Sequence, residues 1–153
     1  MKKIILALSF AMMTSASYAQ ALDDNWDTVT RKLNKENKSY KIEDREQFKY
    51  AIVTESDLTY EKLYAVSKEH DKLELISFIF YDALAYSVWI EQIEKNMIEI
   101  SNSSESRKWY SKNMVKGKKI CFLIVNPSDD EVQSGIVGKL RVSYAGSIFN
   151  NPY

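Results

Sequence analysis

The stretch Lys72–Ile100 reads KLELISFIFYDALAYSVWIEQIEKNMIEI, and it decides the fold that the sequence predicts. One row of apolar residues repeats in it at helical spacing: Leu73, Ile76, Phe80, Leu84 and Val88. Further apolar residues between Leu75 and Ile90 widen this row almost all round. A helix that is apolar on most sides is buried on most sides. We therefore expect residues 72–100 to form a long central helix.

This expected helix is a poor membrane span. Its least interrupted apolar stretch, 75–90, has only 16 residues and contains Asp82. A bilayer core needs about 20 apolar residues in a helix. The helix is therefore expected at the centre of a water-soluble domain.

Shorter helices are expected to pack around this central one. Asp23 or Asp24 can cap a first helix in which Trp26, Val29 and Leu33 share one face. Three other helical segments are expected over 43–54, from Ser56 or Asp57 to about 69–71, and over 105–115. Only four Gly and two Pro occur in the chain, which favours helices over residues 20–117.

The last third of the chain is ambiguous between strand and helix. Residues 120–125 are an apolar run of strand length, and 140–144 alternate as in a half-buried strand. Ser128 and Glu131, however, have the spacing of a capping box. We prefer two strands joined by one or two helical turns. The expected fold is mainly α, around the helix at about 72–100, with a small two-stranded C-terminal hairpin as an α+β alternative.

The N-terminus has the pattern of a secretory signal peptide of bacterial type. Lys2 and Lys3 precede an apolar run over residues 4–13, and small residues follow. Ser17 and Ala19 fit the −3 and −1 positions of a signal peptidase site. We expect cleavage between Ala19 and Gln20, leaving residues 20–153 as one globular domain in the periplasm or secreted, with no membrane span.

Charge and cysteine content narrow the function classes. The chain has 21 basic and 21 acidic residues, and loss of Lys2 and Lys3 leaves 19 against 21. Nucleic acid is therefore not an expected partner, because phosphate binding needs clustered positive charge. Cys121 is the only cysteine, so no internal disulfide forms. We expect it to be a buried thiol, with an intermolecular disulfide as the alternative.

No residue pattern indicates a catalytic or metal site. His70 is the only histidine, and Glu69 and Asp71 would not converge with it on a helix, so we expect a solvated hinge residue. Asp82 lies among apolar residues, and it is either a functional acid of raised pKa or a structural carboxylate paired with Tyr, Lys or Arg. We favour the structural role. No cofactor is expected.

Aromatic residues outside the apolar rows are the one feature of the sequence that points to a function, namely binding of a partner. Tyr and Trp are enriched at binding hot spots, although they also lie at core boundaries. The residues expected to bind a partner are Tyr40, Tyr60, Tyr64, Trp109 and Tyr110.

The sequence thus suggests a non-enzymatic, exported protein that binds another protein. Its most specific form is an immunity or inhibitor protein that neutralises a toxin or cell-wall hydrolase. The first alternative is an accessory or chaperone subunit of an envelope secretion or pilus system. A small hydrolase that uses distant carboxylates is a weaker alternative, because two acids far apart in sequence can meet in space.

Overall fold

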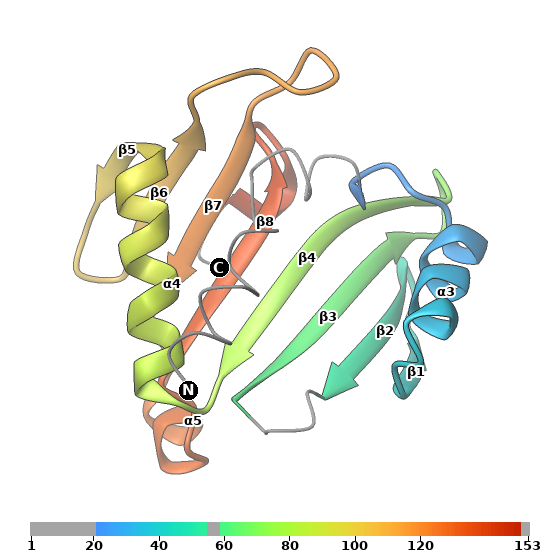
Figure 1. Cartoon of the computed structure of the whole chain (residues 1–153), viewed down its shortest axis with the longest axis horizontal. Helices are drawn as coiled ribbons and strands as arrows, with labels where there is room; N and C mark the ends of the chain where they lie inside the picture. Colours follow the sequence, from blue (N-terminus) through green and yellow to red (C-terminus); the bar gives the residue numbers. More distant parts are fainter. Residues whose placement is uncertain (1–20, 55–58, 151–153) are drawn as a thin grey trace.

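Residues 72–100 form a strand, a helix and a second strand in the computed structural model, which describes residues 21–54 and 59–150 (Figure 1). These elements are β4 (Lys72–Phe80), α4 (Ala83–Asn96) and β5 (Met97–Asn102). The expectation of one central helix is therefore wrong. Strand β4 buries side chains on both of its faces, as Leu75 and Ile76 are 6% and 1% exposed. Such a strand carries a continuous apolar run, which periodicity alone does not distinguish from a buried helix.

The strands make one antiparallel sheet with the order β1-β2-β3-β4-β8-β7-β6-β5. The mainly α fold class and the description of the protein as helical are therefore wrong. The other strands are β1 (Tyr40–Asp44), β2 (Phe48–Thr54), β3 (Tyr60–Ser67), β6 (Ser106–Ser111), β7 (Ile120–Val125) and β8 (Gly138–Tyr144).

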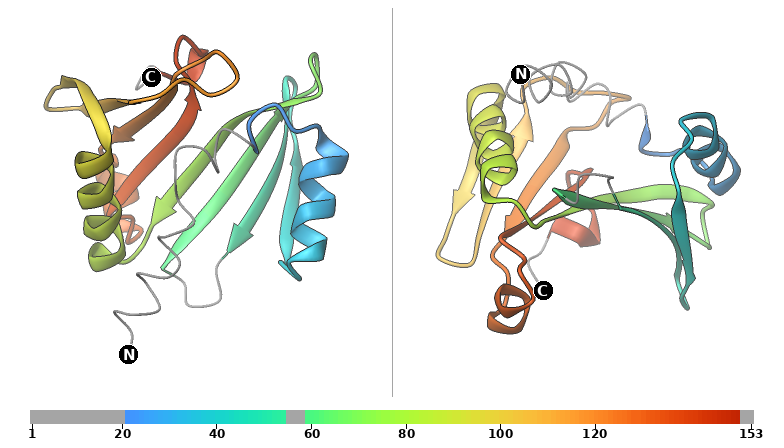
Figure 2. Two further views of the ribbon diagram at one scale, coloured as in Figure 1. Left: turned by 45° about the horizontal axis from the view of Figure 1, so that its top comes forward. Right: turned by 60° about the horizontal axis from the view of Figure 1, so that its bottom comes forward.

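The sheet consists of two halves of similar plan. Helix α3 (Trp26–Lys35) precedes the meander β1–β4, and α4 precedes the meander β5–β8. The halves join where β4 pairs with β8, from Ile76 opposite Val142 to Phe80 opposite Gly138. Figure 2 shows the two helices at opposite ends of the curved sheet. The sequence shows no repeat of this kind, so the similarity lies in the structure alone.

The core lies on the face of the sheet that carries α3 and α4, which we call the inner face. Val29 and Leu33 of α3 and Trp89 of α4 are buried there, and the Trp89 ring packs 4.6 Å from the Phe78 ring. Alternate residues of the central strands complete this core, because side chains two apart in a strand share a face. They include Ile76, Phe78, Phe80, Leu140, Val142, Ile120, Phe122, Ile124 and Trp109.

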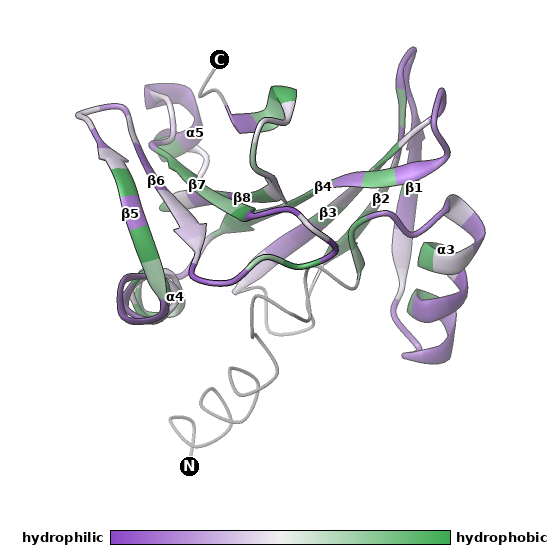
Figure 3. Ribbon diagram, turned by 90° about the horizontal axis from the view of Figure 1, so that it is seen from above, coloured by the Kyte–Doolittle hydropathy of each residue, from purple (hydrophilic) through white to green (hydrophobic). Residues whose placement is uncertain are grey.

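The opposite, outer face carries the short helix α5 (Asp129–Gln133), and Figure 3 shows α5 across the sheet from α4. The Ser128 hydroxyl and the Glu131 carboxylate form the expected capping box of α5. Strands β7 and β8 flank α5 and pair with each other. The two C-terminal strands joined by helical turns are therefore confirmed, but the expected small two-stranded hairpin is wrong, because β7 and β8 are central strands of the eight-stranded sheet. The 3₁₀ helix η1 (Ile148–Asn150) follows β8.

Helix α3 confirms the first expected helix, although Asn25 caps it instead of an aspartate. The three other expected helices are wrong. Residues 43–54 span the end of β1 and the whole of β2, the described part of the segment that ends near 69–71 contains β3, and 105–115 contains β6. Their apolar residues gain burial by pairing in a sheet, and this tertiary gain outweighs weak local helix preference.

The expected signal peptide lies outside the described residues. Among the helices that the structure does describe, none is both long and apolar enough to cross a bilayer.

Candidate functional site

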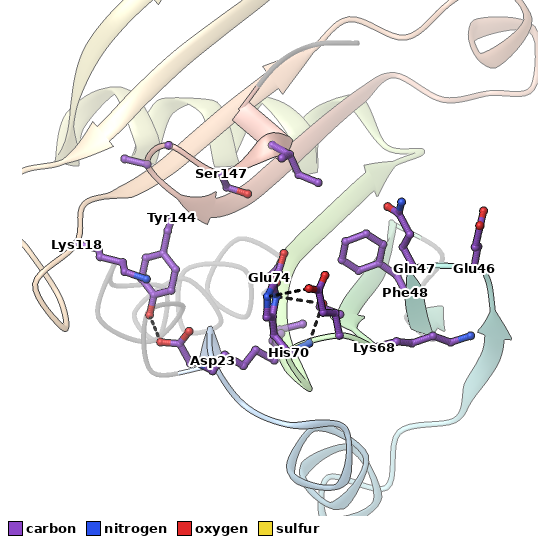
Figure 4. A pocket seen from close by; sticks show the side chains of 17 residues that line it. Asp23, Glu46, Gln47, Phe48, Lys68, His70, Glu74, Lys118, Tyr144 and Ser147 are labelled. Carbon is purple, nitrogen blue, oxygen red and sulfur yellow. Dashed lines mark hydrogen bonds and ion pairs between the residues drawn. The ribbon is translucent and has the colours of Figure 1, made fainter.

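A pocket lies at the end of the sheet where β2 and β4 begin and β3 and β8 end (Figure 4). Its volume is about 800 Å³. We call it the end pocket, and it is lined by residues of the segments 46–48, 67–70, 72–74 and 144–148, with Asp23 and Lys118. Turns that are far apart in the sequence therefore create it.

One side of the end pocket depends on the segment before α3. The Asp23 backbone N–H donates to the Leu73 carbonyl at 3.0 Å, and the Leu73 N–H donates to the Asp24 carbonyl at 2.7 Å. These bonds hold the segment against the start of β4, and the Leu22 side chain is fully buried beside them. The backbone thereby sets the position of the Asp23 carboxylate.

The Asp23 carboxylate accepts a hydrogen bond from the Tyr144 hydroxyl at 2.8 Å. The Lys118 ammonium lies 4.7 Å from the centre of the Tyr144 ring, within cation–π range. Burial, with the bond to Asp23, raises the pKa of Tyr144 well above its usual range. The phenol therefore stays protonated at any physiological pH and acts as a donor.

The middle of the end pocket contains His70, in the turn between β3 and β4. Its Nδ1 lies 3.0 Å from Glu74 Oε1 and 3.5 Å from Ser67 Oγ, as Figure 4 shows for the Glu74 pair. In a catalytic triad, the acid and the nucleophile use opposite ring nitrogens of the histidine. Here both neighbours face the same nitrogen. The arrangement fixes the imidazole but does not prepare Ser67 as a nucleophile.

Both signs of charge line the end pocket, and several of these charges have partners within the chain. Lys68 pairs with Asp44, and Glu74 with His70. Within residues 21–54 and 59–150, no three His, Cys, Asp or Glu side chains are grouped so as to hold a metal ion. Part of the charge that lines the end pocket is therefore compensated within the chain.

The tyrosines expected at a partner interface lie at the core boundary. Tyr40, Tyr60 and Tyr64 are half-buried and pack against the core of the inner face. The Tyr60 ring contacts the Trp89 ring at 6.2 Å, and Lys62 lies 4.9 Å from the Tyr64 ring. These contacts explain the positions of the three residues through packing.

The two aromatic residues of β6 differ in exposure. Trp109 is 1% exposed and belongs to the core, with the Arg107 guanidinium 4.6 Å from its ring, so a partner does not reach it in this structure. Tyr110 is half-buried and faces the other way in the strand. None of the five expected partner-binding residues lines the end pocket.

Asp82 and Cys121 have structural positions. The Asp82 carboxylate is the N-cap of α4 and accepts a hydrogen bond from the Ala85 N–H at 2.7 Å, instead of pairing with a Tyr, Lys or Arg. Cys121 is fully buried in β7, and burial raises its thiol pKa to about 11. The expected buried thiol is confirmed.

The sequence led us to expect His70 to be a solvated hinge residue rather than part of a site, and it did not indicate Asp23, Lys118 or Tyr144 as lining the same pocket. Asp23 and Tyr144 are 121 positions apart, and no local pattern links them. No protein-family model, curated protein or solved structure matches this chain.

Proposed function

We propose that this chain is an exported protein that binds another protein at the end pocket. Its most specific form is an immunity or inhibitor protein for a toxin or cell-wall hydrolase. The single observation that supports this proposal is the composition of the end pocket, an open site in which charges of both signs surround aromatic side chains. Small-molecule sites are mostly apolar and enclosed, whereas protein interfaces have polar rims around an apolar centre.

Individual residues of the end pocket support a protein partner. Ile148 of η1 is 67% exposed at the pocket, and the half-buried Phe48 also lines it. The Asp23–Tyr144 and His70–Glu74 pairs hold polar groups in fixed positions, which lowers the entropy lost on binding. A partner side chain can therefore enter without large rearrangement of the pocket.

The test is capture of a partner from periplasmic extract by the immobilised protein. Ile148→Asp places a charge at the pocket and should abolish capture of a stoichiometric partner. Ile98→Asp is the matched control, because Ile98 is 48% exposed on the edge strand β5, far from η1 in the strand order. Absence of a stoichiometric partner for the wild-type protein, or equal capture by Ile148→Asp, would contradict the proposal.

The immunity or inhibitor role requires a second test, which measures inhibition of the captured protein. If the captured protein is a toxin or hydrolase, its activity should fall when the wild-type protein is added, and Ile148→Asp should not inhibit it. Export is tested separately, by mass spectrometry of the periplasmic product, which should begin at Gln20.

A further inference from the structure

A second surface lies at the other end of β4 and β8, opposite the end pocket. Phe80 pairs with Gly138, and the Val137 N–H donates to the Phe80 carbonyl at 2.8 Å. Val137 and Gly138 therefore both lie opposite Phe80, where the segment after α5 leads into β8. The Tyr81 hydroxyl donates to Glu61 at 3.2 Å, and Glu61 pairs with Ile79. Glu61 and Ile79 alternate with the inner-face residues Tyr60 and Phe78, so the Tyr81 side chain lies on the outer face.

Helix α5 borders this same surface. Lys139, the residue opposite Ile79, donates hydrogen bonds to both carboxylate oxygens of Glu131, at 2.9 and 2.7 Å. The Ile136 N–H donates to the Glu131 carbonyl at 3.0 Å and holds the end of α5 next to the start of β8. Figure 3 shows α5 on the outer side of the sheet.

Apolar side chains are exposed at this surface. Val132 of α5 is 55% exposed, Tyr81 is 39% exposed and Val137 is 36% exposed. Single exposed apolar residues are ordinary on protein surfaces, but a group of them at one place indicates an interaction site. We call these three residues, with Glu61, Asp129 and Asp130, the acid-rimmed patch.

The charge around the apolar residues is negative. The Asp129 and Asp130 carboxylates are exposed, and neither pairs with a cation among the residues that the structure describes. Lys139 is paired with Glu131, and Arg141, two positions further along β8 on the same face, also lies near Glu131. A partner that covers this surface must therefore bring positive charge next to apolar side chains.

We propose that the acid-rimmed patch docks a partner segment in which apolar side chains are flanked by Lys or Arg, such as the face of a basic amphipathic helix. Complementary charge steers and orients such a segment, and burial of Tyr81, Val132 and Val137 supplies affinity. This site is separate from the end pocket and does not depend on what binds there. With two sites at opposite ends of β4 and β8, the protein can bridge two partner surfaces.

The probe is a labelled amphipathic helical peptide of Leu and Lys, and its Leu and Glu counterpart is the control. Fluorescence anisotropy with the purified protein should show binding of the Leu/Lys peptide that weakens with added salt, and much weaker binding of the Leu/Glu peptide. The double variant Asp129→Asn, Asp130→Asn should weaken Leu/Lys binding by roughly tenfold, as expected for loss of two rim charges at about 0.7 kcal/mol each.

Two variants of exposed apolar residues localise the binding. Val132→Ser should weaken Leu/Lys binding, and Ile148→Ser at the end pocket should leave it unchanged. Amide NMR shifts on peptide addition should change most near Tyr81, Val132 and Val137. The proposal is overturned if the Leu/Lys peptide does not bind, if both peptides bind equally, or if the shifts map to the end pocket. The Ile148→Asp variant tests only the end pocket, so its loss of partner capture does not bear on the acid-rimmed patch.

Discussion

The ring of Tyr86 occupies the space where a side chain of Gly138 would lie. A Cβ atom built on Gly138 would stand 2.7 Å from Tyr86 Cδ2 and closer still to Cε2 and Cζ. The Tyr86 ring is itself packed against the Phe80 ring, with centroids 5.3 Å apart. The absence of a side chain at Gly138 therefore lets α4 approach the junction of β4 and β8.

Gly138→Ala should lower the free energy of unfolding by about 1–3 kcal/mol, the usual cost of overpacking a core. Urea denaturation measures the loss. Tyr86→Leu in the same chain should recover part of it, because the smaller side chain leaves room for the methyl group. Strictly additive effects of the two changes would contradict the contact.

Asp82→Ala should destabilise the protein by about 1 kcal/mol, because the first turn of α4 loses its cap. Asp82→Asn should have much less effect, since an amide oxygen also accepts the Ala85 N–H bond. Both values come from urea denaturation. Equal destabilisation by Asp82→Ala and Asp82→Asn would contradict the capping role. Loss of partner capture in a stable Asp82→Asn variant would show a functional role that the cap position does not explain.

Cys121 should not react with a thiol reagent in the folded protein near neutral pH. Its side chain is fully buried, and its thiol pKa of about 11 leaves almost no thiolate. The thiol should react quickly after unfolding in urea, as followed with a chromogenic disulfide reagent. Fast reaction of the folded protein, or a disulfide-linked dimer on a non-reducing gel, would contradict this prediction.

The Glu131 carboxylate should make stability depend on acid pH. Its bonds with Lys139 and then Ser128 lower its pKa in the folded protein below the ordinary 4.5. The lowered pKa means that this contribution is present above the unfolded value and is lost as pH falls through the folded value. Glu131→Gln should therefore be less stable than wild type near neutral pH and equally stable in strong acid.

Lys139→Gln is the matched variant for Glu131, because Lys139 is the main cause of the lowered pKa. Thermal denaturation across the acid range should show a reduced pH dependence in both variants. If wild type remains more stable than the variants at the lowest pH, the Glu131 carboxylate is not the source of the difference in stability.

Tyr144→Phe removes the hydroxyl that donates to Asp23 and leaves the ring in place. We expect a loss of about 0.5–1.5 kcal/mol, typical of one hydrogen bond. Asp23→Asn should cost less when Phe already replaces Tyr144, because the two groups share one bond. Denaturation of the two single variants and the double variant measures this coupling. Zero coupling between the two changes would contradict the hydrogen bond between Tyr144 and Asp23.

Elements with one solvated face could be predicted from the sequence. Trp26, Val29 and Leu33 predict α3 because the helix faces water on its other side. Alternation of apolar residues with Arg141 and Ser143 along 140–144 predicts β8, although Ser143 is itself buried. The capping box of α5 is also local, since in it the side chains of Ser128 and Glu131 each accept a hydrogen bond from the other's backbone N–H. Local patterns are sufficient where the cause of the structure is local.

Only the tertiary structure decided that residues 72–80 are a strand. Their burial comes from neighbours on both faces and from pairing with β3 and β8, and β8 lies more than fifty residues away along the chain. The end pocket depends on the same kind of contact, since Asp23 reaches Tyr144 across 121 positions. The hydrophobic pattern of a segment indicates which of its residues are buried, but it does not indicate which distant strands bury them.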